Sequence, residues 1–126
     1  MNLLLDTCGL LALGNSELPR QSLSALGRAA EVFVSPVSAW EVAIKYQRGG
    51  LRLDVAPLDW FVSLCSRYRL TEISLTSDLL CSSTELPPLH KDPFDRILIA
   101  TALLHNLTIL TSDRAIPTYP GIKTLW

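Results

Sequence analysis

The sequence predicts an α/β domain with a mainly parallel central sheet, for three reasons. Short apolar runs alternate along the chain with longer segments of helical periodicity, which is the order of elements in parallel sheets. The short runs are apolar throughout, as expected of strands that helices cover on both faces. The chain has 126 residues, 48% of them hydrophobic, so we expect a single domain, residues 1–126, with a core of its own.

The first strand and the first two helices are predicted from the N-terminal segment. Leu3-Leu4-Leu5 is a continuous apolar run, and Asp6-Thr7 after it has the side chains of a helix cap. We therefore expect a strand at residues 3–5 and a helix at residues 7–13. A second helix is expected at residues 19–30, where apolar side chains recur at helical spacing: Leu23, Leu26 and Ala30.

One strand and two helices are predicted next along the chain. Val32-Phe33-Val34 is rich in β-branched and aromatic residues, which favour a strand. Ser35-Pro36 supplies an N-cap and a proline at the first helical position, so a helix should run from there to about residue 48, before Gly49-Gly50. Another helix is expected at residues 57–68, with one apolar stripe: Leu58, Phe61, Val62 and Cys65.

The C-terminal part predicts the rest of the sheet and its most apolar helix. Residues 72–75 are a candidate strand, followed by a helix that Thr76 would cap. Pro87-Pro88 breaks the chain, and Asp92-Pro93 begins the apolar helix, which should run to about residue 106. Strands at residues 107–111 and 122–125 complete the predicted sheet.

The composition excludes several classes of protein. A formal net charge of −1 provides no global basic field for nucleic-acid binding, so such contacts must come from local basic patches. The N-terminus has no basic segment ahead of its short apolar run, which argues against a signal peptide. No segment approaches the ~20 uncharged apolar residues that span a bilayer. We therefore expect a cytoplasmic protein without a membrane segment.

The three cysteines form neither a metal-binding nor a disulfide pattern. Cys8, Cys65 and Cys81 have no C-x-x-C spacing, and an odd number cannot pair completely. His90 and His105 do not complete a zinc site with them. We interpret all three as reduced, mostly buried thiols of a cytoplasmic protein.

Two aspartates follow predicted strands at the edge where a parallel sheet binds ligands. Asp6 comes directly after the first strand, and Asp113 follows Leu110-Thr111-Ser112. Ligands of open parallel sheets bind outside the carboxyl ends of the strands. Either aspartate alone could instead be a turn former or a helix cap.

A glutamate lies within an apolar stripe of the helix that starts at Pro36. Positions 37, 40, 41 and 44 share one face of this helix, and only one of them is charged: Val37, Trp40, Glu41 and Ile44. A carboxylate in such a place is costly to bury unless it is paired or bound to a cation. Alternatively, Glu41 extends from the edge of the stripe to water or to an arginine.

Two further aspartates begin the most apolar helix. Asp92 before Pro93 has the signature of an N-cap, and Asp95 lies in the first turn, where an acid stabilises the helix dipole. Capping alone could account for both. However, residues 97–104 are apolar on every face, so we expect this helix to be buried, with its first acids facing the interior or a cleft.

Together these carboxylates predict a metal site for phosphodiester chemistry. Several carboxylates at one sheet edge repel one another unless a hard cation lies among them. Mg²⁺ and Mn²⁺ prefer oxygen ligands and can activate water for in-line displacement at phosphorus. Nearby cationic side chains could hold a nucleic-acid strand, although each could equally be an ordinary solvated residue: Lys45, Arg48, Lys91, Arg96 and Arg114.

Four segments carry a resemblance to a known family: residues 3–7, residues 35–45 with Trp40-Glu41, residues 90–96, and residues 110–113. In their order and spacing they resemble PIN-domain nucleases, in particular the VapC-type toxins of toxin–antitoxin pairs. The resemblance covers essentially the whole chain. Its most specific segment precedes the buried helix and reads His-Lys-Asp-Pro-Phe-Asp-Arg. One departure is Cys8-Gly9, where relatives usually carry histidine and an aliphatic residue.

The resemblance implies a three-layer α/β/α fold and RNA cleavage that depends on Mg²⁺ or Mn²⁺. The family's acidic quartet corresponds here to Asp6, Glu41, Asp95 and Asp113, with Asp92 as an accessory metal ligand. The resemblance also implies a homodimer and a small antitoxin that blocks the site. Around the quartet we expect five side chains to contact the RNA: Thr7, Lys45, Arg96, Ser112 and Arg114.

Two other classes of function stay open as alternatives. A phosphotransfer domain is also α/β with an aspartate after a strand. However, the phosphatase pattern needs a second aspartate where Cys8 stands, and a receiver needs a lysine at the end of a later strand that we do not find. The other alternative is a degenerate nuclease fold that only binds protein or RNA, and the presence of all four carboxylates argues against it.

Overall fold

A five-stranded sheet forms the centre of the protein in a computed structural model that describes residues 1–126. Every neighbouring pair of strands is parallel, which confirms the predicted α/β class. The spatial order is β3-β2-β1-β4-β5. In chain order the strands are β1 (Asn2–Leu5), β2 (Glu31–Val34), β3 (Thr71–Glu72), β4 (Thr108–Leu110) and β5 (Lys123–Leu125).

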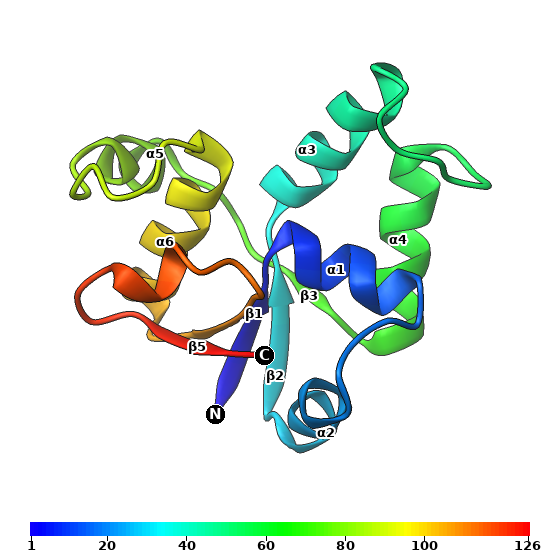
Figure 1. The fold of residues 1–126 in the computed structure, drawn as a ribbon, viewed down its shortest axis with the longest axis horizontal. Coiled ribbons are helices and arrows are strands. Elements are labelled where there is room, and N and C mark those ends of the chain that lie inside the picture. Colours follow the sequence, from blue (N-terminus) through cyan, green and yellow to red (C-terminus); the bar gives the residue numbers. More distant parts are fainter.

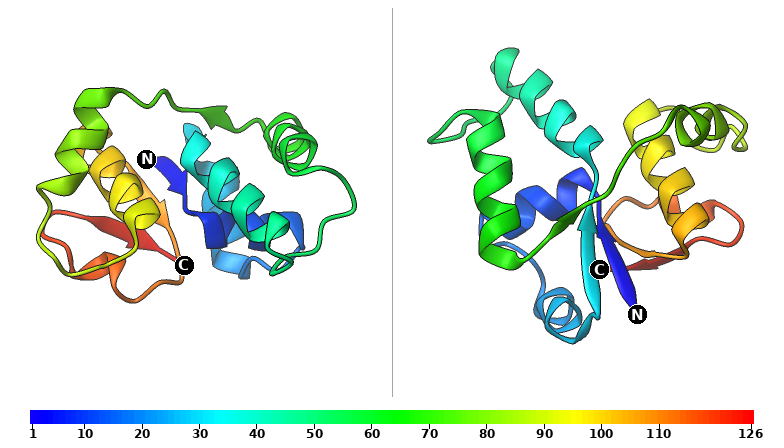
Figure 2. Two further views of the ribbon diagram at one scale, coloured as in Figure 1. Left: turned by 90° about the horizontal axis from the view of Figure 1, so that it is seen from above. Right: turned by 180° about the vertical axis from the view of Figure 1, so that it is seen from behind.

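Helices cover both faces of the sheet, so the fold is the expected three-layer α/β/α arrangement. The packing places α1, α2 and α4 on one face, and α6 with the short turn η1 on the other (Figure 1, Figure 2). No helix is both long enough and apolar enough to cross a lipid bilayer. The helices are α1 (Thr7–Gly14), α2 (Arg20–Arg28), α3 (Pro36–Gln47), α4 (Pro57–Tyr68), α5 (Ser77–Thr84), α6 (Pro93–His105) and the 3-10 turn η1 (Ile116–Thr118).

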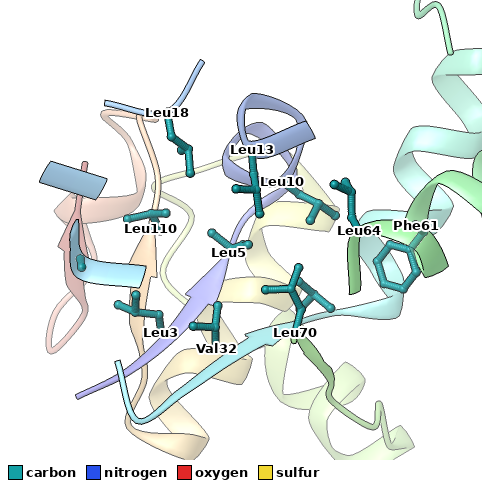
Figure 3. Close-up of a cluster of buried hydrophobic side chains, with 12 residues drawn as sticks. Leu3, Leu5, Leu10, Leu13, Leu18, Val32, Phe61, Leu64, Leu70 and Leu110 are labelled. Carbon is teal, nitrogen blue, oxygen red and sulfur yellow. The ribbon is translucent and has the colours of Figure 1, made fainter. Parts of the chain in front are cut away.

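The first strand supplies both halves of the core because successive side chains of a strand point to opposite faces. Leu3 and Leu5 face the α1, α2 and α4 side, where they pack with residues such as Leu10 and Phe61 (Figure 3). Leu4 faces the other side, where it packs with α6 and η1. All three leucines of β1 are fully buried, as a run of apolar residues in a central strand predicts.

The strand order creates a point where the direction of winding reverses. From β1 the chain continues through β2 to β3 on one side, and it then crosses to β4 and β5 on the other side of β1. In such sheets the crevice at the carboxyl ends of the strands, next to the reversal, is the usual ligand site. In this chain the reversal lies between β1 and β4, which Asp6 and Asp113 follow.

The buried faces of two helices differ from the predicted stripes. On α2, Leu23 is 49% exposed, and the small residues Ser22 and Ala25 face the interior instead. On α4, the buried side chains are Phe61 and Leu64, whereas the other stripe positions are exposed or only partly buried. Each helix buries only a narrow face, and the apolar residues on its flank stay at the surface.

The helix α6 is buried along its middle rather than along its whole apolar run. Leu98 to Ala102 are buried, but Leu103 and Leu104 are 39% and 64% exposed because the last turn leaves the core. The cysteines were also only partly predicted. All three are free, but Cys8 and Cys81 are exposed and Cys65 is half-buried, so the expectation of mostly buried thiols was wrong.

Candidate active site

Asp6 lies at the carboxyl end of β1 and caps helix α1. Its Oδ1 accepts a hydrogen bond from the backbone N–H of Gly9 at 2.7 Å, and its Oδ2 accepts one from the hydroxyl of Thr111, just after β4. The residue is 1% exposed, so both carboxylate oxygens have fixed directions. Asp6 thus joins β1, α1 and the end of β4 at the reversal point.

The first turn of α1 lies so close to β4 that position 9 requires glycine. A Cβ atom on Gly9 would lie 2.8 Å from the carbonyl oxygen of Leu110 and 3.1 Å from Oδ1 of Asp6. The contact with Leu110 is shorter than van der Waals separation, and it involves a backbone atom of a buried strand. Gly9, the second residue of the Cys8-Gly9 departure, therefore allows α1 to pack closer to β4 than a larger residue would.

Glu41 reaches the same region from α3, and its carboxylate is buried and fully paired. The hydroxyl of Thr7 donates to its Oε1 at 2.6 Å, and the ammonium of Lys45, one turn along the helix, lies 3.0 Å from its Oε2. The hydroxyl of Ser38 lies 3.1 Å from that of Thr7. Glu41 is therefore held inside the protein by a lysine and by the hydroxyl of Thr7, which Ser38 in turn contacts, rather than extending to water.

Asp95 and Asp113 meet at one imidazole. The Nε2 atom of His90 lies 2.9 Å from Oδ2 of Asp95 and 3.0 Å from Oδ2 of Asp113. The backbone N–H of Asp92 donates to Nδ1 of the same ring at 3.3 Å, so the proton of the neutral ring lies on Nε2. Because protonation would add a proton only at Nδ1, Nε2 is a donor to both carboxylates in either state.

Burial and mutual charge raise the pKa of two carboxyl groups in this cluster. Desolvation is the larger cause for Asp6, to which the charges of Asp113 and Glu41 add, and its pKa rises to about 6. Desolvation, followed by the charge of Asp92, raises the pKa of Asp95 to about 7. Both groups would be easier to ionise with a cation beside them.

The exposed end of the cluster behaves differently. Partial burial acts to raise the pKa of Asp113, but hydrogen bonds from the N–H of Ala115 and from His90 outweigh it and lower the pKa. Burial acts to lower the pKa of His90, but the hydrogen bond to Asp113 and the charge of Asp95 outweigh it and raise the pKa. The imidazole therefore supplies part of the positive charge that these two carboxylates need.

Arg96, expected to contact RNA, instead holds the loop that carries His90. Its guanidinium donates to backbone carbonyl oxygens at 2.9–3.0 Å, and Nη1 also donates to the hydroxyl of Tyr119 at 3.1 Å. The same hydroxyl accepts the backbone N–H of His90 at 3.0 Å. Because both terminal nitrogens of Arg96 already donate to these groups, few of its N–H groups are free to bind a substrate. The carbonyl oxygens belong to Ser83, Leu86 and Pro87.

The remaining predicted residues lie around the cluster. Asp92 caps α6, because its Oδ1 accepts the N–H of Phe94 at 2.9 Å, and its charge is also felt by Asp95. Ser112 and Arg114 are exposed on the segment after β4. Arg48 and Lys91 are also exposed, so these cations are more accessible to a ligand than Arg96, which is half-buried and has its donors engaged.

The donor set fits a hard divalent cation. One oxygen each of Asp95 and Asp113 and a nitrogen of His90 lie within 4.8 Å of one another. Since Nε2 of His90 carries a proton, the two carboxylates are the candidate ligands and His90 is their hydrogen-bond donor. Asp6 and Glu41 are close enough for their charges to raise the pKa of Asp95. Mg²⁺ and Mn²⁺ prefer carboxylate oxygens as ligands. The carboxylates here outnumber the positively charged side chains that contact them, so the site has negative charge left for such an ion.

Sequence reasoning missed three residues of this site. His90 was considered only as a zinc ligand with the cysteines, although it stands two residues before Asp92 in the most specific motif. Thr111 and Tyr119 carry no local signal, because their partners Asp6 and Arg96 are distant in the sequence. A histidine inside an acidic motif is the one signal that could have been followed.

Comparison with known proteins agrees with this geometry. The PIN domain family matches residues 3–122. Ribonuclease VapC22 of Mycobacterium tuberculosis is 28% identical over 105 residues, which are 81% of this chain and 79% of that protein.

Two solved structures share the fold along nearly the whole chain. The VapBC2 complex of Rickettsia felis, bound to a DNA fragment from its promoter, has a TM-score of 0.73 at 16% identity and covers 99% of this chain and 98% of its own. A toxin–antitoxin complex from Klebsiella pneumoniae has a TM-score of 0.66 at 21% identity, over 98% and 96% of the two chains. With the family match over residues 3–122, the chain belongs to the PIN domain family.

Proposed function

We propose that the protein is a metal-dependent endoribonuclease and the toxin of a toxin–antitoxin pair. The observation that carries this proposal is the convergence of four carboxylates from separate elements at the carboxyl edge of the sheet, beside the reversal between β1 and β4. Such a cluster costs stability, as the raised pKa values of Asp6 and Asp95 indicate. Binding of a divalent cation by these negative charges would explain why the protein keeps a cluster that lowers its stability. The four residues are Asp6, Glu41, Asp95 and Asp113.

The same residues would hold Mg²⁺ or Mn²⁺, with Asp92 as an accessory ligand. When bound, the ion would supply an activated water and offset charge on the phosphate. The protein's own groups prepare this site. Thr111 and the N–H of Gly9 fix the oxygens of Asp6, while Thr7 and Lys45 fix those of Glu41.

His90 would orient the ligands on the other side of the site. Its Nε2–H holds the carboxylates of Asp95 and Asp113 toward the same point, and groups that hydrogen-bond to metal ligands commonly affect metal affinity. The exposed residues that remain for the phosphate backbone are Lys45, Ser112 and Arg114. Thr7 acts on Glu41 rather than on RNA, and Arg96 acts on the loop.

The proposed partners are a small antitoxin and a second copy of the chain. The relatives described as ribonuclease VapC22 and as VapBC or toxin–antitoxin complexes support the antitoxin. The exposed apolar side chains of α5 and α6, which include Leu80, Leu103 and Leu104, support a contact between proteins. Light scattering at micromolar concentration should give the mass of a dimer, and the mass of a monomer would contradict this part.

The proposal is tested by incubating the protein with cellular RNA and mapping the new RNA ends. We expect cleavage with Mg²⁺ or Mn²⁺ that EDTA abolishes and that Asp95→Asn removes. Mg²⁺ should also raise the melting temperature of the wild type, because it binds only the folded state, and raise that of Asp95→Asn less. Full activity in EDTA, or hydrolysis of small phosphomonoesters alone, would refute the nuclease. Metal binding without cleavage would indicate a degenerate binding module.

A further inference from the structure

A large aromatic side chain is exposed beside the acidic cluster. Trp40 is 59% exposed, whereas the sequence pattern placed it in a buried stripe. Its indole meets the ring of Phe94 edge to face, with ring centroids 5.2 Å apart and an angle of 83° between the planes. Tryptophan is usually well buried, so an exposed indole held in place by a second ring is a feature that a monomer does not need.

The aromatic pair is adjacent in sequence to two carboxylates of the site. Trp40 precedes Glu41 on α3, and Phe94 precedes Asp95 on α6. Since the charge of Glu41 acts on Asp95 and the two rings touch, the pair bridges the helices α3 and α6 alongside the cluster. The exposed indole therefore lies next to the place where a scissile phosphate would be held.

Exposed cations occur on α3 and just before α6, the two helices that carry the aromatic pair, although the whole chain has a net charge of −1. Arg48, the C-cap residue of α3, is exposed about two turns beyond Trp40. The side chain of Lys45 is 50% exposed, and Lys91 is exposed just before α6. An aromatic face with cations beside it is the combination that binds single-stranded nucleic acid, by stacking a base and pairing with phosphates.

We propose that Trp40, braced by Phe94, stacks the base of an unpaired nucleotide next to the phosphodiester bond that is cleaved. This inference rests on the proposed ribonuclease function. It narrows the substrate class, because a base can stack on the indole only when it has left its own helix. The RNA must therefore be single-stranded, or opened in a loop, beside the bond.

Contact with another protein is the competing explanation for the exposed indole, and the position of Trp40 favours RNA. Leu104, which is 64% exposed, lies nine residues beyond Asp95 on α6, about 14 Å along the helix axis at 1.5 Å per residue. That part of α6 offers an apolar surface distant from the carboxylates. Trp40 instead lies directly before Glu41, next to the acidic cluster that would hold the substrate phosphate.

The kinetic test compares three variants on an RNA that the wild type cleaves. Trp40→Ala should lower kcat/KM about tenfold or more, mainly through KM, since stacking on an aromatic ring holds the base before and during reaction. Trp40→Phe should keep most of the activity. Leu58→Ala on α4, the matched control that also removes exposed apolar surface at a side chain 68% exposed, should change kcat/KM less than twofold. The wild-type protein should cleave the same RNA more slowly after a complementary strand has paired with the nucleotide beside the cleaved bond.

Photocrosslinking tests the contact without requiring cleavage. Single-stranded oligouridylate carrying 5-iodouridine is irradiated with the protein in EDTA, and the crosslinked residue is identified by mass spectrometry. We expect the crosslink at Trp40. A crosslink elsewhere, wild-type kcat/KM in Trp40→Ala, or a change of oligomeric mass in Trp40→Ala would overturn the inference. If the wild type cleaves no RNA, the proposed function fails, and the crosslink still decides whether RNA stacks on Trp40.

Discussion

The carboxylate cluster should destabilise the metal-free protein, and Asp95→Asn should relieve that cost. The pKa of Asp95 rises from its ordinary value of 3.8 to about 7, and its side chain is 13% exposed. Because a tenfold change in proton affinity is about 1.4 kcal/mol, the ionised group costs at most about 4 kcal/mol in the folded state. The attraction to the imidazole of His90 is already included in this raised pKa. Asparagine is not a perfect copy of the neutral carboxyl group, however, and an imperfectly paired amide in a largely buried place offsets about 2 kcal/mol. We therefore expect a net gain of about 2 kcal/mol at pH 8.

The sign of the pH dependence follows from the same pKa. The folded state holds the proton of Asp95 more tightly than the unfolded state, so this group destabilises the fold as the pH rises from about 4 to 7, and by a constant amount above that. The advantage of Asp95→Asn should accordingly fall by at least half when the pH is lowered from 8 to 5.

Thermal melting in EDTA at the two pH values measures this effect. A gain of about 2 kcal/mol corresponds to a rise of roughly 8 °C for a domain of this size. Asp59→Asn is the matched control, because Asp59 is an exposed acid in the first turn of α4, and we expect it to show no gain. If Asp95→Asn melts at or below the wild-type temperature at pH 8, charge and burial do not set the stability of the cluster, and the reasoning is refuted.

Three further substitutions test single interactions by urea unfolding. Arg96→Met should cost about 3 kcal/mol, because several backbone carbonyl groups, two of them in partly buried hydrogen bonds, lose a charged donor. A smaller loss than in Arg96→Lys would contradict the loop-holding role. Asp92→Ala should cost about 1 kcal/mol as a lost N-cap, and RNA cleavage should fall less than in Asp95→Asn; the reverse order would exchange the roles of these aspartates. Gly9→Ala should cost about 2 kcal/mol through overpacking against β4, so an unchanged midpoint would argue against that close approach.

The strands and helices could be predicted because each has a local cause. The run Leu3-Leu4-Leu5 is buried on both faces, and the caps at Asp6, Ser35, Thr76 and Asp92 all form the expected side-chain bonds. The fold class followed from the order of these elements. The candidate strand at 72–75 was misplaced, since β3 spans Thr71–Glu72, shares only Glu72 with the prediction, and pairs with β2 alone at the edge of the sheet.

What could not be predicted depends on contacts between distant segments. The exposed flank of α4 and the exposure of Trp40 depend on which face of a helix meets its neighbours, and periodicity locates a stripe only to within part of a turn. The contact residues of Arg96 lie at the end of α5, in the loop that follows it and just after η1, and no local pattern describes how these segments meet. The sequence therefore indicated which carboxylates belong together, but not that a histidine bridges two of them or that an arginine supports that histidine.

The placement of β1 between β2 and β4 has a consequence for biosynthesis. Asp6 and Glu41 leave the ribosome early, but Asp113 follows the last-but-one strand, and Asp6 accepts its hydrogen bond from Thr111. A nascent chain that ends before β4 lacks a neighbour for one edge of β1 and one of the four carboxylates. The complete acidic cluster can thus assemble only after β4 and Asp113 have left the ribosome, so products that terminate before β4 should be harmless to the cell that makes them.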